Sequence, residues 1–263
     1  MPCFLINADN SIMMKTVLVP LILFLWIYSV LSARKLPSYV NVCKRTDPGI
    51  SRCWQQTVQE LQPYLIKGIP EFDIPPIEPF VVEQIRLDQG NSPTVNFIAN
   101  LTDLKFYGGG NYKVAYANAN LLETKTVNLG LTFPKLNAIG EYKAKGRVLL
   151  FQFEGDGMFK GEFSDVKMNG TWYFKITKKK GAEYFVIDRE AIDVVTGKIY
   201  IRLENLFNGA PDLTENVNKA INDNIDALYT DFKPLLTTTL STVSRSYFNR
   251  VFELFPYDVL LPE

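Results

Sequence analysis

The sequence contains no histidine among its 263 residues, and this absence removes a large part of enzymology. Without an imidazole the chain cannot supply a Ser-His-Asp triad, a Cys-His pair, an HExxH zinc site or a histidine proton shuttle. Any catalysis would have to use carboxylates, lysine, tyrosine or serine. We therefore expect neither an enzyme nor a bound metal or cofactor.

The chain also lacks net charge, because 28 basic side chains balance 28 acidic ones. A neutral chain has no overall field to attract DNA, RNA or anionic lipid, although a local patch stays possible. We expect no nucleic-acid partner and no stable membrane association. Hydrophobic residues make up 47% of the chain and aromatic residues 13%. This is enough for a core in one large or two small domains, and it argues against disorder.

An almost wholly apolar segment runs from Val17 to Val30 and is followed by the small residues Ser32 and Ala33. This is the pattern of a secretory signal peptide, and it predicts cleavage after Ser32 or Ala33. The alternative is an uncleaved membrane anchor. The anchor is disfavoured because the apolar run is short for a bilayer span and contains Pro20.

Cleavage at this point makes residues 1–33 a signal peptide and residues 34–263 a single secreted domain. Asp9 is unusual in the basic first part of such a signal, so the true start is expected at Met13 or Met14. The protein is therefore predicted to be extracellular.

Cys43 and Cys53 are the cysteines of the predicted mature chain. In an oxidising compartment a close pair predicts one disulfide, whereas the alternative is two reduced thiols. Such a bridge would contribute about 2 to 3 kcal/mol by closing a short loop, with no catalytic role. Asn100 and Asn169 each begin an N-x-[ST] triplet, which makes them candidate glycosylation sites.

A short amphipathic helix is predicted early in the domain, because apolar residues recur there every three or four positions. These residues are Trp54, Val58, Leu61 and Leu65. Ser51 is the expected N-cap, and Pro63 lies where it can kink or end the helix. The proline-rich stretch 69–79 then predicts an extended connector.

Residues 81–207 alternate between apolar and polar side chains, which is typical of antiparallel strands with one buried face. The phase of this alternation shifts within residues 95–106, and the shift predicts a bulge near Asp103. Glycine-containing turns are expected to join the strands as hairpins. These turns lie at residues 108–111, 155–157, 180–181 and 196–197.

From Leu213 to Phe255 apolar residues recur mostly every three or four positions, which predicts one amphipathic helix of about 44 residues. Asp212 and Glu215 resemble a capping box at its start. Pro234 is expected to bend the helix without ending it. A coiled coil is the alternative, but the apolar stripe lacks flanking charge pairs, which favours burial in the chain's own sheet.

Together these elements predict an α+β fold, in which a long C-terminal helix is wrapped by a strongly curved antiparallel sheet. A helix is a cylinder about 10 to 12 Å wide, so strands wrapped around it cannot easily close on it everywhere. We therefore expect an elongated apolar cavity, a typical site for a hydrophobic ligand. The alternative, a core packed without any cavity, stays open at this point.

Several short motifs occur in the same order as in one insect family. They are the Cys43 and Cys53 pair, Gly68-Ile69-Pro70, Gly140-Glu141-Tyr142, Gly146-Arg147-Val148-Leu149-Leu150, Glu154-Gly155-Asp156-Gly157, Leu206-Phe207-Asn208-Gly209 and the ending Pro256-Tyr257-Asp258-Val259-Leu260-Leu261-Pro262-Glu263. With the export signal, they make the chain resemble the takeout and juvenile-hormone-binding protein family over essentially the whole predicted mature chain.

The resemblance implies a long helix wrapped by a curved sheet, related to one half of the bactericidal/permeability-increasing lipid-binding domains. It also implies a tunnel that carries terpenoid hormones, fatty acids or other lipids in haemolymph or another extracellular fluid. Two mature cysteines cannot form the second disulfide of the hormone-binding branch of moths. Ile225 and Leu261 also depart from the aromatic and the phenylalanine of many takeout-like members. These differences favour the takeout-like branch and count against juvenile hormone itself as the ligand.

Candidate ligand-binding residues are the inward positions of the predicted strands and helices. Trp54 and Val58 could form a movable lid, and Tyr112 and Tyr142 could offer a hydroxyl to a ligand oxygen. The full set is Trp54, Val58, Phe97, Tyr112, Leu129, Leu131, Phe133, Tyr142, Phe151, Phe153, Trp172, Phe174, Val217, Ile221 and Leu228. For each position ordinary core packing is the competing interpretation.

The leading functional prediction is a secreted carrier of a small lipophilic ligand, with a receptor or another secreted protein as an open possibility for a partner. The alternative is a membrane-engaging lipid-transfer protein, which would show a basic or an exposed apolar tip. A secreted hydrolase is disfavoured by the missing histidine. Its best carboxylates are Glu154, Asp156 and Glu162, and these are expected to be exposed around a Gly-Asp-Gly turn.

Overall fold

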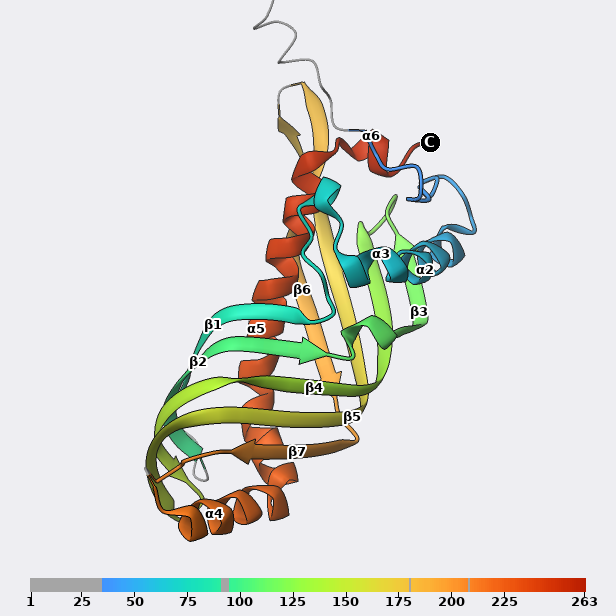
Figure 1. Ribbon diagram of the computed structural model, residues 1–263. Coiled ribbons are helices and arrows are strands. Elements are labelled where there is room, and N and C mark those ends of the chain that lie inside the picture. Colours follow the sequence, from blue (N-terminus) through green and yellow to red (C-terminus); the bar gives the residue numbers. More distant parts are fainter. Residues whose placement is uncertain (1–34, 91–94, 180, 208) are drawn as a thin grey trace, which may run out of the picture. The chain divides into compact units, whose positions relative to one another are not determined.

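The computed structural model describes residues 35–90, 95–179, 181–207 and 209–263 (Figure 1). The predicted signal peptide lies outside these described residues, so its cleavage stays a prediction. Contacts divide the chain into two units, of which Leu36–Glu263 is the second. All elements named below belong to this second unit.

Two short helices lie near the start of this unit, α2 over Ile50–Glu60 and α3 over Gln62–Lys67. Pro63 lies in the first turn of α3, where its missing N–H costs nothing, so the helix is interrupted near the position that the sequence indicated. The predicted N-cap was wrong, because Ser51 lies inside α2. Its Oγ instead accepts a hydrogen bond from the Ala119 N–H of the sheet at 3.0 Å.

The segment around α2 is fastened covalently as predicted. Cys43 and Cys53 form a disulfide with an S–S distance of 2.02 Å and a Cα–Cα distance of 5.8 Å. After α3 the connector is less extended than expected, because Pro70–Phe72 forms the short 3-10 helix η1. Ile69 and Ile74 hydrogen-bond to each other across this turn, with both N–H groups as donors.

In the described part of the chain, seven strands form one antiparallel sheet, which confirms the predicted sheet. Figure 1 shows β1, β2, β4 and β5 bending along their length. The order of neighbours is β1-β2-β4-β5-β6, with β3 paired to β4 and β7 paired to β5. The strands are β1 (Phe80–Gln89), β2 (Val95–Tyr107), β3 (Lys113–Asn120), β4 (Thr126–Val148), β5 (Phe151–Lys179), β6 (Ala182–Val195) and β7 (Lys198–Leu203).

Strands β4 and β5 are long enough for two shorter strands to share one edge of each. β3 pairs with the first part of β4, and β2 pairs with the rest of it. In the same way β6 pairs with the end of β5, and β7 pairs with its middle. The expected hairpins at residues 108–111 and 196–197 were therefore wrong. These glycines pass the chain from one strand to the next along the same edge.

The Gly-Asp-Gly turn expected at residues 155–157 was also wrong, because these residues lie inside β5. A side chain at Gly155 would come within 2.5 Å of the Asn205 carbonyl oxygen, so glycine is required there by close backbone packing. The turn between β4 and β5 is formed by residues 149 and 150 instead. Gly181 does lie between the paired strands β5 and β6, as predicted, whereas residue 180 lies outside the described residues.

The predicted bulge near Asp103 is confirmed. The register between β2 and β4 shifts between Thr102 and Lys105, and Asp103 has a positive φ of 50°. A bulge adds one residue to one strand of a pair and changes which side chains face the core. Leu101 and Leu104 are consequently both buried although they differ in parity.

A second change of phase occurs in the middle of β4 and β5, although the register between them is continuous. Val127 and Leu129 are buried in the first half of β4, whereas Tyr142 and Ala144 are buried in the second half. The parity of the buried residues changes near Pro134 of β4. Facing this point on β5, the backbone of Asp165 is irregular, with a positive φ of 54°. The two halves of the sheet therefore bury side chains of opposite parity.

The C-terminal segment forms two long helices where a single one was expected, which is a correction. Helix α4 spans Pro211–Asp223, α5 spans Ile225–Leu254, and the short α6 spans Tyr257–Leu260. The interruption is at Asn224, whose Nδ2 donates to the Ala220 carbonyl oxygen and competes with the helical pattern. The predicted capping box is also absent, because the N-cap is residue 210 and makes no side-chain hydrogen bond.

Pro234 lies inside α5, and the helix continues through it, as expected. The break near Asn224 has a tertiary origin as well. Helix α4 packs against β7, whereas α5 packs against β6, and these two strands occupy successive parts of the β5 edge. The two helices must follow different strands, so their axes diverge, as Figure 1 shows.

Asparagine side chains of α4 serve as hydrogen-bond partners for the edge of β7. Asn218 accepts from the Leu203 N–H and donates to the Leu203 carbonyl, both at 2.8 Å. Asn222 makes the same pair of bonds with Ile201, at 2.9 and 2.7 Å. An edge strand exposes unpaired N–H and C=O groups, and these two side chains satisfy four of them.

The buried residues form separate clusters. The α4 cluster joins β2, β4 and β5 to α4 and the start of α5, and it includes Leu101, Val217 and Leu228. At the other end, two clusters lie between α2, the sheet and the second half of α5; we call them together the α2 clusters. The apolar core is thus concentrated at the two ends of α5.

Candidate functional site: the apolar face of helix α5 and two open pockets

Helix α5 is 30 residues long, yet among its residues, all of which the structure describes, only Leu228 is buried. Its other apolar side chains are partly exposed, and Leu236 and Phe248 are 40% and 38% exposed. A central helix in a closed core would bury a continuous stripe. The partly buried apolar residues of this face are Ile225, Phe232, Leu235, Leu240, Val243, Tyr247, Val251 and Phe252.

Aromatic contacts join this face to the strands at several levels. Near the α4 cluster, the Phe232 ring lies 5.3 Å from the Phe97 ring of β2. At the α2 end, the Phe252 ring lies 5.4 Å from the Phe174 ring of β5. Phe232 and Phe252 are themselves only partly buried, as are the apolar residues of this face between them, so the cover is incomplete along the helix.

The predicted ligand-binding residues fall into two groups that the structure places at opposite ends of α5. Those in or against the α4 cluster are Phe97, Tyr142, Phe151, Phe153, Val217, Ile221 and Leu228. Those in or against the α2 clusters are Trp54, Val58, Leu129, Leu131, Trp172 and Phe174. Phe133 and Tyr112 lie apart from both groups, with their rings 6.4 Å from each other. Their role as ligand contacts stays a prediction.

Both candidate tyrosines already donate their hydroxyl protons to backbone carbonyls. Tyr112 donates to the Val58 carbonyl at 2.5 Å, and Tyr142 donates to the Glu204 carbonyl at 2.7 Å. Burial raises the pKa of each phenol to about 12, and the nearby carboxylates Asp156 and Glu204 add to the effect at Tyr142. A ligand oxygen would therefore have to compete with an existing bond for either proton.

Helix α2, the predicted lid, and helix α3 after it are held by polar contacts to the segment around the start of β3. Gln62 of α3 donates to the Gly110 and Tyr112 carbonyls before β3 at 2.7 and 2.8 Å, and Gln59 of α2 accepts from the Val114 N–H of β3 at 3.0 Å. Trp54 of α2 packs against both α2 clusters. Its Nε1 is buried and has no hydrogen-bond partner among the described residues. Movement of this helix stays a prediction.

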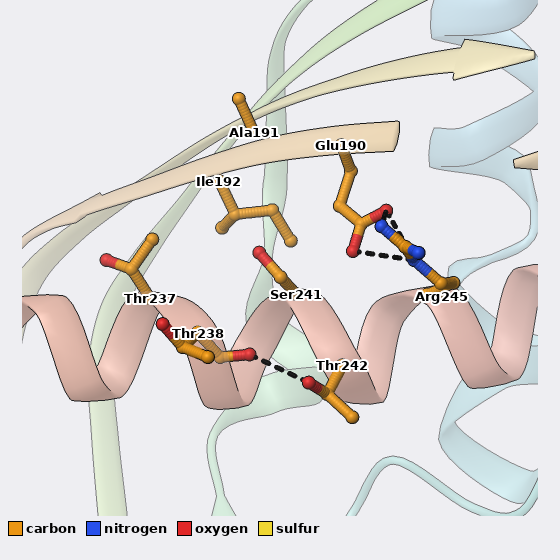
Figure 2. A pocket seen from close by; sticks show the side chains of 8 residues that line it. All are labelled: Glu190, Ala191, Ile192, Thr237, Thr238, Ser241, Thr242 and Arg245. Atoms are coloured by element: carbon orange, nitrogen blue, oxygen red, sulfur yellow. Dashed lines mark hydrogen bonds and ion pairs between the residues drawn. The ribbon is translucent and has the colours of Figure 1, made fainter. Parts of the chain in front are cut away.

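A polar pocket of about 580 Å³ lies between β6 and α5 (Figure 2). The Arg245 guanidinium binds the Glu190 carboxylate through Nε at 2.8 and 3.0 Å and through Nη2 at 2.7 Å. These bonds raise the pKa of Arg245. The lining residues are Glu190, Ala191, Ile192, Thr237, Thr238, Ser241, Thr242 and Arg245.

The chemistry of this polar pocket differs from that of an apolar tunnel. The Glu190 side chain is 3% exposed, so its charge is neutralised by Arg245 rather than by water. Thr238 and Thr242 donate their hydroxyls to helix carbonyls one turn earlier, at 2.9 and 3.0 Å. Sequence reasoning missed this ion pair because its partners are separated by 55 positions.

A second pocket, of about 710 Å³, lies beside the β4–β5 turn and opens to the surface. Apolar side chains and charged ones share its lining, and Phe97 and Phe153 connect it with the α4 cluster. Its residues are Asn96, Phe97, Ile98, Lys145, Gly146, Arg147, Gln152, Phe153, Glu154 and Phe207. Neither pocket is the enclosed, elongated cavity that the sequence predicted, and that cavity stays a prediction.

Among the described residues, no group of three or more histidine, cysteine, aspartate or glutamate side chains could hold a metal ion. No helix in the described part of the chain has the length and hydropathy needed to cross a bilayer. The candidate sequons lie on strands, with Asn100 on β2 and Asn169 on β5. Asn169 Oδ1 accepts a hydrogen bond from the Tyr116 hydroxyl at 3.1 Å. Their glycosylation stays a prediction.

The sequence model of the haemolymph juvenile hormone binding protein family matches residues 21–262. The chain belongs to this family. The match spans nearly the whole chain, which confirms the family resemblance drawn from the short motifs.

Relatives of this family agree with the assignment. The circadian clock-controlled protein daywake of Drosophila yakuba is 24% identical over 234 residues, covering 86% of this chain and 88% of the relative. Its counterpart in Drosophila melanogaster is 22% identical over 230 residues, covering 84% and 86%. This chain is thus similar to daywake over most of both lengths.

Solved structures support the fold. Takeout 1 of Epiphyas postvittana superposes with a TM-score of 0.70 at 18% identity, covering 85% of this chain and 100% of that protein. This likeness confirms the predicted architecture of a curved antiparallel sheet with a C-terminal helix and a short N-terminal helix. A lipopolysaccharide binding protein gives a TM-score of 0.33 at 13% identity, covering 82% of this chain and 39% of that one. That score is too low to carry a structural conclusion.

Proposed function

We propose that this member of the haemolymph juvenile hormone binding protein family is an extracellular carrier of a small hydrophobic ligand, bound along the apolar face of α5. The observation that carries the proposal is the incomplete burial of this face, where one residue of a 30-residue helix is buried. A hydrophobic guest would cover the partly exposed apolar side chains and remove them from water.

The magnitude is adequate for a carrier. A lipid that removes about 300 Å² of apolar surface from water gains about 7 kcal/mol at 25 cal/mol per Å², which corresponds to micromolar affinity. Hydrogen bonds would mainly orient the ligand. The proposal includes no covalent step, in keeping with a family named for binding.

Two observations support an extracellular location. Disulfides persist mainly in oxidising compartments, and Cys43 and Cys53 are bridged. The family takes its name from haemolymph. The ligand class we propose is a terpenoid, a fatty acid or a comparable lipid, and the departures from the hormone-binding branch count against juvenile hormone itself.

Native mass spectrometry of the purified secreted protein, followed by solvent extraction, tests this function. We expect a mass increment of about one lipid per chain, as a single binding space implies. A protein that carries no lipid and takes up no fluorescent fatty acid at micromolar concentration would overturn the proposal.

A pair of variants on α5 locates the site. Leu235→Gln places a polar amide on the partly buried face, whereas Ala227→Gln places the same amide at an exposed position of the same helix. We expect the first variant to weaken fatty-acid binding about tenfold and the second to leave it unchanged. Equal effects from the two variants would show that the ligand does not lie along this face.

A further inference from the structure

The turn between β4 and β5 departs from the usual chemistry of tight turns. Val148 pairs with Phe151, so Leu149 and Leu150 alone form the connection. Leu149 has a φ of 54°, in the left-handed region that favours glycine or asparagine. Leu150 is 91% exposed, more than any other large apolar side chain among the described residues.

Both residues are therefore locally unfavourable. A glycine or asparagine would fit the positive φ at Leu149 better, and a polar residue would suit the exposure of Leu150. Leu149 is partly buried and packs against the α4 cluster, which accounts for an apolar side chain at that position. The regular pairing of the surrounding strands gives no such reason for the exposed Leu150. Local rules are broken most often at functional positions, and the observed outlier is the reason to look for one here.

The position of this turn suggests its partner. The pocket of about 710 Å³ begins two residues away on β5, at Gln152, and two residues away on β4, at Arg147. At about 3.3 Å per residue, its nearest lining residues lie roughly 7 to 10 Å from the turn. Phe97 and Phe153 connect this pocket with the α4 cluster, which reaches the first turn of α5.

The charges around the turn indicate what kind of surface it suits. Lys145 and Glu154 stand directly opposite each other on β4 and β5, and Lys143 stands opposite Asp156. These two pairs balance each other, and Arg147, which stands opposite Gln152 next to the turn, adds one positive charge, so the surface lacks a strong field of either sign. An exposed leucine in such a surface suits the headgroup region of a neutral bilayer better than an anionic one.

We propose that the Leu149–Leu150 turn inserts into the headgroup region of a phospholipid bilayer and brings the adjacent pocket to the membrane. A hydrophobic ligand then passes between the bilayer and the protein through this end of the molecule. The exchange step rests on the proposed carrier function, whereas the insertion of the turn does not. Attachment is reversible, because one small turn buries far less apolar surface than a membrane anchor.

Co-sedimentation of the secreted chain with phosphatidylcholine vesicles, at millimolar lipid, tests the insertion. We expect Leu150→Asn to lower the partition coefficient about tenfold, as loss of one buried leucine implies, and Leu150→Trp to raise it. Leu122→Asn is the matched control, because Leu122 is a 57% exposed leucine near the β3–β4 connection. Unchanged binding by both Leu150 variants, or an equal loss in the control, would overturn the proposal.

The ionic strength of the same assay separates apolar insertion from attraction by charge. We expect less than a twofold change in partitioning between about 0.05 and 0.5 M salt, because Arg147 is the one charge next to the turn without an acidic residue opposite it on the paired strand. A steep loss of binding with salt would show that the protein attaches through charges elsewhere, and the insertion of the turn would then be wrong.

Fluorescent fatty-acid binding without vesicles keeps the two proposals apart. If all variants bind the probe equally and only the Leu150 variants change vesicle binding and transfer rate, both proposals hold. If no variant binds the probe but vesicle binding depends on Leu150, the carrier function fails while the insertion stands. If the probe binds and vesicle binding does not depend on Leu150, the insertion fails alone.

Discussion

Replacement of Asn218 by alanine should destabilise the protein strongly, because this side chain completes the free edge of β7. Asn218 is 2% exposed and makes three hydrogen bonds: two with Leu203 at 2.8 Å, and one to the Thr214 carbonyl at 3.0 Å. Its loss leaves the N–H and C=O of the partly buried Leu203 without these partners, beneath the buried face of α4. At about 1 to 3 kcal/mol for each buried unsatisfied group, we expect a loss of about 2 to 5 kcal/mol.

Asn222→Ala is the matched control. Asn222 makes the same pair of bonds with Ile201 one turn later, but it is only partly buried, so water can replace part of what is lost. We expect a loss of about 1 kcal/mol there. Equilibrium urea unfolding of the oxidised chain, followed by circular dichroism, measures both values. A loss below about 1 kcal/mol for Asn218→Ala, or equal losses in both variants, would refute the reasoning.

Three further predictions concern buried groups at the candidate site. Burial raises the pKa of Tyr112 and Tyr142 from 10.0 to about 12 in the folded chain. Between these values the phenols ionise in the unfolded chain before they ionise in the folded one. Their contribution to the free energy of unfolding is therefore complete below pH 10 and falls as the pH rises toward 12. Urea unfolding across this range should show that decline, and constant stability would contradict it. Gly170→Ala should cost roughly 1 to 3 kcal/mol, since its Cβ would lie 2.2 Å from the Trp172 ring; a neutral effect in urea unfolding would be inconsistent with the packing. Trp54→Phe should cost less stability than Trp172→Phe, because only Trp172 has a partner for its indole N–H; the reverse order would refute this assignment.

Local sequence patterns predicted many elements correctly. Alternation predicted the antiparallel strands, the phase shift predicted the bulge at Asp103, and the spacing of Cys43 and Cys53 predicted their disulfide. Each of these signals is short-range, because side-chain direction repeats every two residues in a strand and the paired cysteines are ten positions apart. Proline was equally informative at Pro63 and Pro234, where its effect on helices is local.

The errors share a different origin. Gly155 was assigned to a turn because glycine marks turns, but here it allows the backbone near Asn205 to approach β5 closely. The break at Asn224 was missed because the apolar periodicity continues across it. Only the pairing of β6 and β7 along one edge of β5 shows why two helices are needed.

The candidate site shows the same division. The apolar stripe of α5 could be identified from periodicity, but its incomplete burial could not, because burial depends on which strands reach the helix. The Glu190 and Arg245 pair lies between a strand and a helix that are far apart in sequence. The exposed Leu150 was hidden as well, since the motif that contains it gave no sign of a turn.

Composition and short spacings fix the apolar and polar faces of the strands and helices, the disulfide and the absence of histidine chemistry. Long-range packing fixes which strand lies beside which, where the C-terminal segment breaks, and how much of α5 remains uncovered. These features depend on contacts between segments tens of residues apart, and the free energy of such contacts is set by packing rather than by local periodicity.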